Sequence, residues 1–96
     1  MIFDENALEQ ICIRNDVARL RVFGSVVRGE DRPGSDLDLL VEFTRPKSLL
    51  TLVGIEQELE EALGRKVDLV TPAALSPYIR DQVLREARVL YERPAA

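Results

Sequence analysis

The chain has 96 residues, of which 46% are hydrophobic and 31% charged, a balance typical of globular proteins and unlike disordered chains. No apolar run is long enough to cross a bilayer, and the first residues lack the basic start of a secretory signal, so we expect a cytoplasmic protein without a membrane role. The formal net charge of −4 argues against a protein whose main task is to grip nucleic acid, because that affinity depends largely on Lys and Arg. We expect residues 1–96 to form one domain.

The chain contains one cysteine, Cys12, and no histidine. This composition excludes intramolecular disulfides, zinc sites and histidine-based catalytic triads. Cys12 shares a helical stripe with Leu8 and Ile11, which favours core packing over a nucleophilic role. Any metal chemistry must therefore use oxygen ligands.

The first helix is predicted to begin after Asp4, as its N-cap, and to run to about Asn15. A strand follows at 19–23. Gly24 and Ser25 then predict a tight turn that leads into a short helix, because glycine permits the turn and serine is a good N-terminal residue.

Residues 30–34 are rich in charge and turn formers and predict a loop. The next strand is predicted over 36–43. Alternation along a strand places Asp36 and Asp38 on one face, and it gives the other face to Leu37, Leu39, Val41 and Phe43.

Ser48 is the predicted N-cap of a longer helix that ends at Gly64. Its expected inward stripe contains Leu49, Leu52, Val53, Glu56, Leu59 and Leu63. Its other acids scatter around the helix, so a solvated surface is a better interpretation than a metal site for Glu56, Glu58, Glu60 and Glu61.

A third strand is predicted over 66–71, and Ser76 with Pro77 begins a last helix, whose expected apolar stripe is Ile79, Val83, Leu84 and Ala87. A final edge strand is predicted at 88–91. The assembled order predicts an α/β (α+β) fold, with a small mixed sheet and helices packed mainly on one face. Tyr78 and Tyr91 could stack on a base or dock a partner, but buried rings with wet hydroxyl groups are more typical.

The acids on the second strand are the centre of the functional argument. Asp36 and Asp38 aim at one point, and two like charges held so close favour a bound cation. Mg²⁺ suits them, because it takes oxygen ligands and shares its remaining positions with substrate phosphates. Two bridging carboxylates could hold two such ions, as in enzymes that displace groups at phosphorus.

Asp68 is the candidate for a third carboxylate, because it interrupts an apolar strand that should lie next to the strand of Asp36 and Asp38. The alternative is structural: Asp68 could lie at an exposed strand end or pair with Arg65 or Lys66.

The Gly24-Ser25 turn could cradle phosphate with a backbone N–H and a hydroxyl group. Arg28, one helical turn later, could reach the same phosphate or hold the turn in shape. Taken alone, such a turn is more often structural. Its position before the acid pair favours binding of a nucleoside triphosphate.

Together these residues resemble the minimal nucleotidyltransferases, the small branch of the DNA polymerase β-like superfamily. The resemblance lies in Gly24-Ser25, Arg28-Gly29 and Ser35-Asp36-Leu37-Asp38-Leu39-Leu40-Val41. It implies the polymerase β-like fold, with ATP phosphates on Gly24, Ser25 and Arg28, and Mg²⁺ on Asp36, Asp38 and Asp68. Asp68 would serve near the incoming nucleophile.

Members of this branch often act as antitoxins of HEPN-domain toxins, some by transferring AMP from ATP to the partner. The resemblance therefore implies ATP as substrate, a HEPN-type protein as partner and a protein hydroxyl group as acceptor. A partner or a second copy of the chain, as a homo-oligomer, should complete the site. The alternative function is a non-catalytic nucleotide-binding antitoxin that neutralises its partner by direct binding.

Other classes that use Asp-x-Asp fit less well. Haloacid-dehalogenase-type phosphatases place this pair after an apolar strand, whereas a polar loop precedes it here. A calcium loop would need oxygen ligands and a glycine where Leu40 and Val41 stand. Sugar-nucleotide transferases need far more chain.

Overall fold

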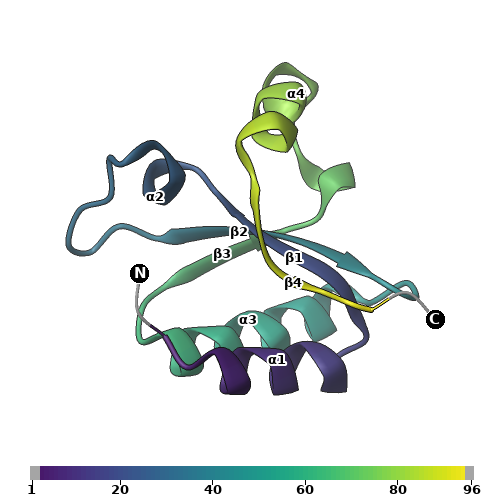
Figure 1. Ribbon diagram of the computed structural model, residues 1–96. Helices are drawn as coiled ribbons and strands as arrows, with labels where there is room; N and C mark the ends of the chain where they lie inside the picture. The colour runs from purple at the N-terminus through teal and green to yellow at the C-terminus, as the bar shows by residue number, and fades with distance from the viewer. Residues whose placement is uncertain (1–2, 95–96) are drawn as a thin grey trace.

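The computed structural model describes residues 3–94, and its centre is a sheet with the strand order β3-β2-β1-β4 (Figure 1). The four strands are β1 (Val17–Phe23), β2 (Leu37–Phe43), β3 (Val67–Val70) and β4 (Arg88–Glu92). β1 runs antiparallel to β2 and β4, whereas β2 and β3 are parallel. The sheet is therefore mixed, and the predicted fold class is confirmed.

The helices lie on both sides of this sheet, whereas the sequence predicted them mainly on one face. The long helix α3 (Leu49–Leu63) and α1 (Glu5–Arg14) pack beside each other under one face. The four-residue helix α2 (Ser25–Arg28), the 3-10 turn η1 (Pro72–Ala74) and α4 (Pro77–Glu86) lie on the other side (Figure 1). No helix in residues 3–94 has the length and apolar character needed to span a bilayer.

Side chains cap the three longer helices where the sequence predicts. The Asp4 carboxylate accepts hydrogen bonds from the N–H groups of Asn6 and Ala7 at 3.0 and 3.1 Å. The hydroxyl groups of Ser48 and Ser76 accept the corresponding bonds at α3 and α4. Each cap satisfies donors that have no partner inside the helix.

Two apolar clusters hold the layers together. The larger lies between the sheet and α1 with α3, and it includes Leu37, Leu39 and Val41 of β2, as their alternation predicts. Cys12 is 1% exposed in this cluster, and burial raises the pKa of its thiol to about 12, which supports core packing. The smaller cluster packs α4 onto the other face through Phe23, Leu40, Leu75 and Val83.

The predicted apolar stripes of α3 and α4 are partly wrong. Leu49 and Val53 are 78% and 44% exposed, while Ile55 is buried instead. On α4 only Val83 is buried, and Ile79 and Leu84 are exposed. Leu49 and Ile79 stand in the first turns of their helices, beyond the edge of the clusters. Val53 and Leu84 lie about 100° or more around their helices from the buried Ile55, Leu59 and Val83, so they do not face the sheet.

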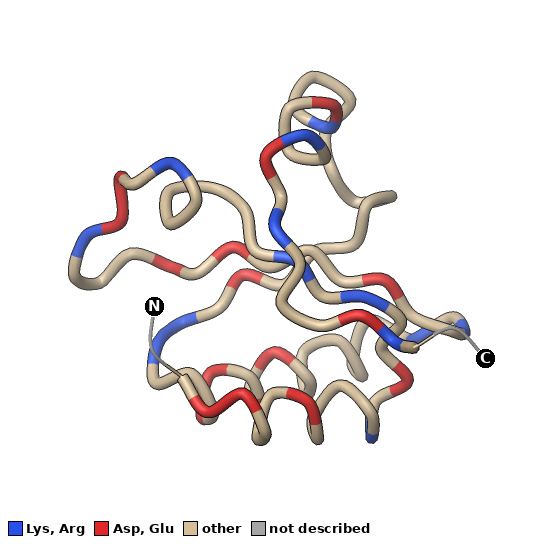
Figure 2. Tube along the Cα trace, viewed as in Figure 1, with Lys and Arg blue, Asp and Glu red and all other residues tan. Residues whose placement is uncertain are grey.

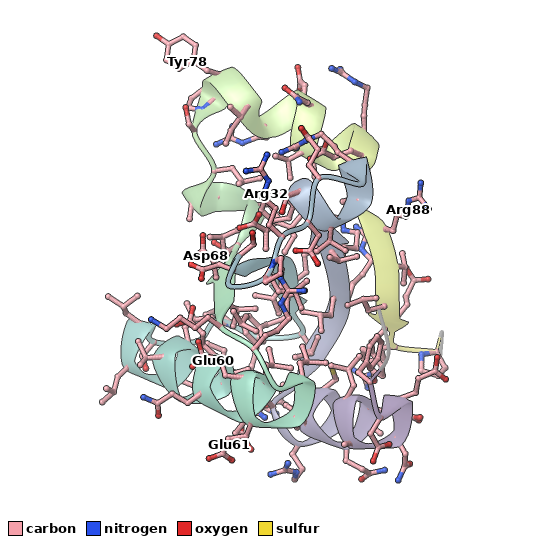
Figure 3. All side chains as sticks on the ribbon, turned by 90° about the vertical axis from the view of Figure 1, so that its left-hand side faces the viewer. Arg32, Glu60, Glu61, Asp68, Tyr78 and Arg88 are labelled. Carbon is pink, nitrogen blue, oxygen red and sulfur yellow. The ribbon has the colours of Figure 1, made fainter. Side chains whose placement is uncertain are left out.

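Tyr78 is also a correction, because its side chain is 97% exposed. It stands near the start of α4, and Figure 3 shows it pointing away from the sheet. Tyr91 follows the prediction, since it packs against the larger cluster.

The expectation that the acids of α3 mostly face water is wrong for two of them. Glu60 accepts a hydrogen bond from the N–H of Val67, and Glu56 accepts one from the N–H of Leu69, each at 3.0 Å. β3 is an edge strand, so these carboxylates satisfy N–H groups that have no neighbouring strand.

Candidate active site

The turn between β1 and α2 is shaped around Gly24. This residue has φ = 80° and ψ = −147°, a conformation that is almost restricted to glycine. A Cβ atom at this position would overlap the carboxylate of Asp38. Gly24 therefore makes the turn and leaves space for an acid on the neighbouring strand.

Asp38 and Asp68 face each other across two parallel strands. They are register partners, and Phe23, which precedes the turn, is the partner of Asp38 on the other side. In-register residues of neighbouring strands share a face, so both carboxylates lie on the side of the sheet that carries α2. Asp36 stands just before β2.

Of the two structural roles considered for Asp68, an exposed position and an ion pair with Arg65 or Lys66, only the first is observed. Its side chain is exposed, but Arg65 donates to Asp31 at 3.0 and 2.8 Å and to the carbonyl oxygen of Ser35 at 2.7 Å. Within residues 3–94, neither Arg65 nor Lys66 forms an ion pair with Asp68. The carboxylate therefore stands without a basic partner in this part of the chain.

The acids influence each other electrostatically. The pKa of Asp38 is raised, first by burial and then by the negative charges of Asp68 and Asp36. Arg28 acts in the opposite direction, and Glu86 adds to the increase. A site that makes ionisation of a carboxylate costly gains from a bound cation.

Arg28 is held by two carboxylates. Its Nε donates to Glu30 at 2.6 Å, and its Nη1 donates to Glu86 at 3.0 Å. The same oxygen of Glu86 also accepts a hydrogen bond from the N–H of Gly24 at 3.0 Å. Of the two roles predicted for Arg28, this arrangement displays the one that shapes the turn.

Glu86 is the residue of this site that sequence reasoning missed. It lies 62 positions after Gly24 at the end of α4, in a charged segment that resembles any solvated helix end. No local spacing connects it with the turn, so only the packing of α4 on the sheet could have revealed it.

The donor set fits Mg²⁺ in its chemistry. Carboxylate oxygens and a serine hydroxyl are hard ligands, and burial together with the nearby carboxylates of Asp68 and Asp36 raises the pKa of Asp38. In residues 3–94, no three acidic side chains gather closely enough to hold an ion on their own. The predicted set Asp36, Asp38 and Asp68 is thus not gathered into such a cluster, and a Mg²⁺ ion here would need water and phosphate oxygens as further ligands.

A cavity of about 730 Å³ lies next to Asp36 along the chain. Its lining comes from the loop before β2 and the corner before β3, and consists of Asp31, Arg32, Pro33, Gly34, Ser35, Gly64, Arg65 and Lys66. The basic segments of both parts lie at the same end of the molecule (Figure 2). Figure 3 shows Arg32 and Asp68 on this same side. The cavity thus offers positive charge beside the acids.

Known proteins resemble this chain in sequence. A family model described as the nucleotidyltransferase domain matches residues 5–90. The protein adenylyltransferase MntA of Thermococcus cleftensis is 47% identical over 73 residues, which cover 76% of this chain and 74% of that protein.

Solved structures also resemble this chain, in sequence and in fold. One assigned to the minimal nucleotidyltransferases is 49% identical, with a TM-score of 0.73, and the match covers 88% of this chain and 85% of that one. The crystal structure of a toxin–antitoxin with AMP-PNP has a TM-score of 0.77 at 25% identity, covering 94% of this chain and 74% of that one.

Proposed function

Because the chain belongs to the nucleotidyltransferase domain family and, within it, to the minimal nucleotidyltransferases, we propose that it transfers AMP from ATP to a hydroxyl group of a partner protein in a Mg²⁺-dependent reaction. The relative from Thermococcus cleftensis is named as a protein adenylyltransferase, which supports the protein acceptor. The partner class that the sequence motif implies is a HEPN-type toxin.

The observation that carries this proposal is the register of Asp38 and Asp68 beside the Gly24 turn. It brings carboxylates from two strands to the end of the sheet where α2 begins. A triphosphate on the turn would place its α-phosphorus near these acids. Asp36 and Asp38 would hold Mg²⁺, which would neutralise phosphate charge and stabilise the leaving oxygen.

The chain's own residues then have separate tasks. The N–H and hydroxyl groups of Ser25, at the start of α2, bind the outer phosphates. Asp68 faces the acceptor and takes its proton as the hydroxyl oxygen attacks the α-phosphorus. The new phosphoester bond forms while the bond to pyrophosphate breaks, so the products are an AMP-modified protein and pyrophosphate.

The acceptor side of the site is open in the described residues, since Asp68 is exposed. A partner protein that covers this side would deliver its hydroxyl group and exclude water. One related structure is that of a toxin–antitoxin with AMP-PNP, which supports a toxin as that partner. A second copy of this chain is the competing way to close the site.

The test is a transfer assay with ATP labelled at the α-phosphate, Mg²⁺ and the protein encoded next to this chain. We expect label on the partner with the wild type and none with Asp36→Asn or Asp38→Asn. Asp81→Asn, an exposed charge change on α4, is the matched control and should keep the activity.

The same variants distinguish the proposed transfer from the competing function, a non-catalytic binding module. If the wild type transfers no label, and both Asp36→Asn and Asp38→Asn still neutralise the partner, the chain is a non-catalytic binding module. Transfer that persists in both variants would instead contradict the assignment of the acids.

A further inference from the structure

Glu86 connects α4 with the turn that begins α2. Its side chain is 16% exposed, and a single oxygen, Oε1, accepts hydrogen bonds from both Gly24 and Arg28 at 3.0 Å. The other partner of Arg28, Glu30, is 61% exposed. The contact with Glu86 is therefore the more buried of the two that hold Arg28.

Both groups that Glu86 binds belong to the phosphate side of the site. Gly24 is buried, so its N–H would be left without a partner if Glu86 were removed. A guanidinium group carries five N–H donors, and Glu30 with Glu86 engages only part of them. Arg28 therefore keeps donors for a phosphate while its direction is fixed.

We propose that Glu86 is a positioning residue for the nucleotide. It holds the Gly24-Ser25 turn and the guanidinium group of Arg28 in the arrangement that receives the phosphates of ATP. This inference rests on the proposed function and extends it to a residue of α4. The positive charge of Arg28 offsets part of the negative charge of Glu30 and Glu86, and its remaining donors are free to face the phosphates.

Two substitutions of Glu86 distinguish the effect of its negative charge from the effect of its hydrogen bonds. Glu86→Gln keeps an oxygen that can accept from Gly24 but loses the charge that orients Arg28. Glu86→Ala loses both contacts. Asp81→Asn is the control, because it removes one negative charge from an exposed position of the same helix.

The experiment measures the dissociation constant of ATP with Mg²⁺ by calorimetry on the chain, and the KM for ATP and kcat in the transfer assay. For Glu86→Gln we expect the dissociation constant and KM to rise about tenfold, with kcat at saturating ATP unchanged. Glu86→Ala should weaken binding further, and Asp81→Asn should match the wild type. Thermal melting of each variant shows that it is folded.

Two outcomes of the calorimetric comparison would overturn the inference about Glu86. Unchanged ATP binding in folded Glu86→Gln and Glu86→Ala would show that Glu86 only supports the fold. Tighter binding in Glu86→Gln would show that the carboxylate competes with phosphate. If the wild type binds ATP but transfers no label, the proposed transfer fails, while the calorimetric comparison still decides the role of Glu86.

Discussion

The acids show which residue positions could be inferred from the sequence. The positions of Asp36 and Asp38 depend on strand alternation, which is a local property, and Leu39 and Val41 on the opposite face are buried as expected. The position of Asp68 required only that its strand lie beside β2, and the register bears this out. Their roles in metal binding and catalysis stay predictions.

Tyr78 and Glu86 show where such inference ends. Whether a tyrosine is buried depends on where its helix begins relative to the core, and Tyr78 lies beyond it. Glu86 reaches Gly24 only because α4 folds back over the sheet. Long-range packing of this kind leaves no periodic pattern in the sequence.

Asp38 allows a prediction about stability. Its pKa is raised in the folded chain, so the folded state binds more protons than the unfolded state as pH rises above about 3.9, the ordinary value for Asp. Stability therefore falls through this range and up to the raised pKa. We expect metal-free Asp38→Asn to melt at a higher temperature than the wild type at pH 7.

The comparison is made by thermal melting in EDTA at pH 7 and again near pH 4, about the ordinary pKa of Asp, with Asp81→Asn as control. The advantage of Asp38→Asn should shrink at the lower pH, because more of the wild-type carboxyl is protonated there. A wild type that melts higher than Asp38→Asn at pH 7 would show that the ionised carboxylate is stabilised.

At the scale of elements, α3 protects the free edge of β3. Glu60 and Glu56 stand one helical turn apart and accept from Val67 and Leu69, which alternate along the strand. Both acids are visible in the sequence, but the glutamates of this helix are spread around its circumference, as on a helix surface that faces water. Their partners are backbone N–H groups, which carry no residue signature, so this function could not be predicted.

Removing these carboxylates should loosen the strand that carries Asp68. We expect Glu56→Ala and Glu60→Ala each to lower the free energy of unfolding by about 1 kcal/mol, the typical worth of one hydrogen bond. Glu61→Ala is the control, since Glu61 is exposed and points away from the sheet (Figure 3). Urea unfolding measures the differences. Equal stability of all three variants would contradict the edge-protecting role.

At the scale of the whole molecule, the two faces of the sheet have different roles: one carries most of the core and the other carries the candidate site. α1 and α3 cover the face that carries most of the core, while the other face holds the acids, α2 and the smaller cluster under α4. The sequence predicts the order of elements and the mixed sheet because caps, turns and alternation are local. The second cluster was not predicted, since it joins residues from four separate segments.

The most direct test of the account is a crystal structure of the chain with Mg²⁺ and a non-hydrolysable ATP analogue. The account predicts a Mg²⁺ ion bound by Asp36 and Asp38, the outer phosphates on the turn at Ser25, and Asp68 facing the α-phosphate. A triphosphate bound elsewhere, for example between Arg32 and Lys66 with Asp36 and Asp38 free of metal, would contradict it.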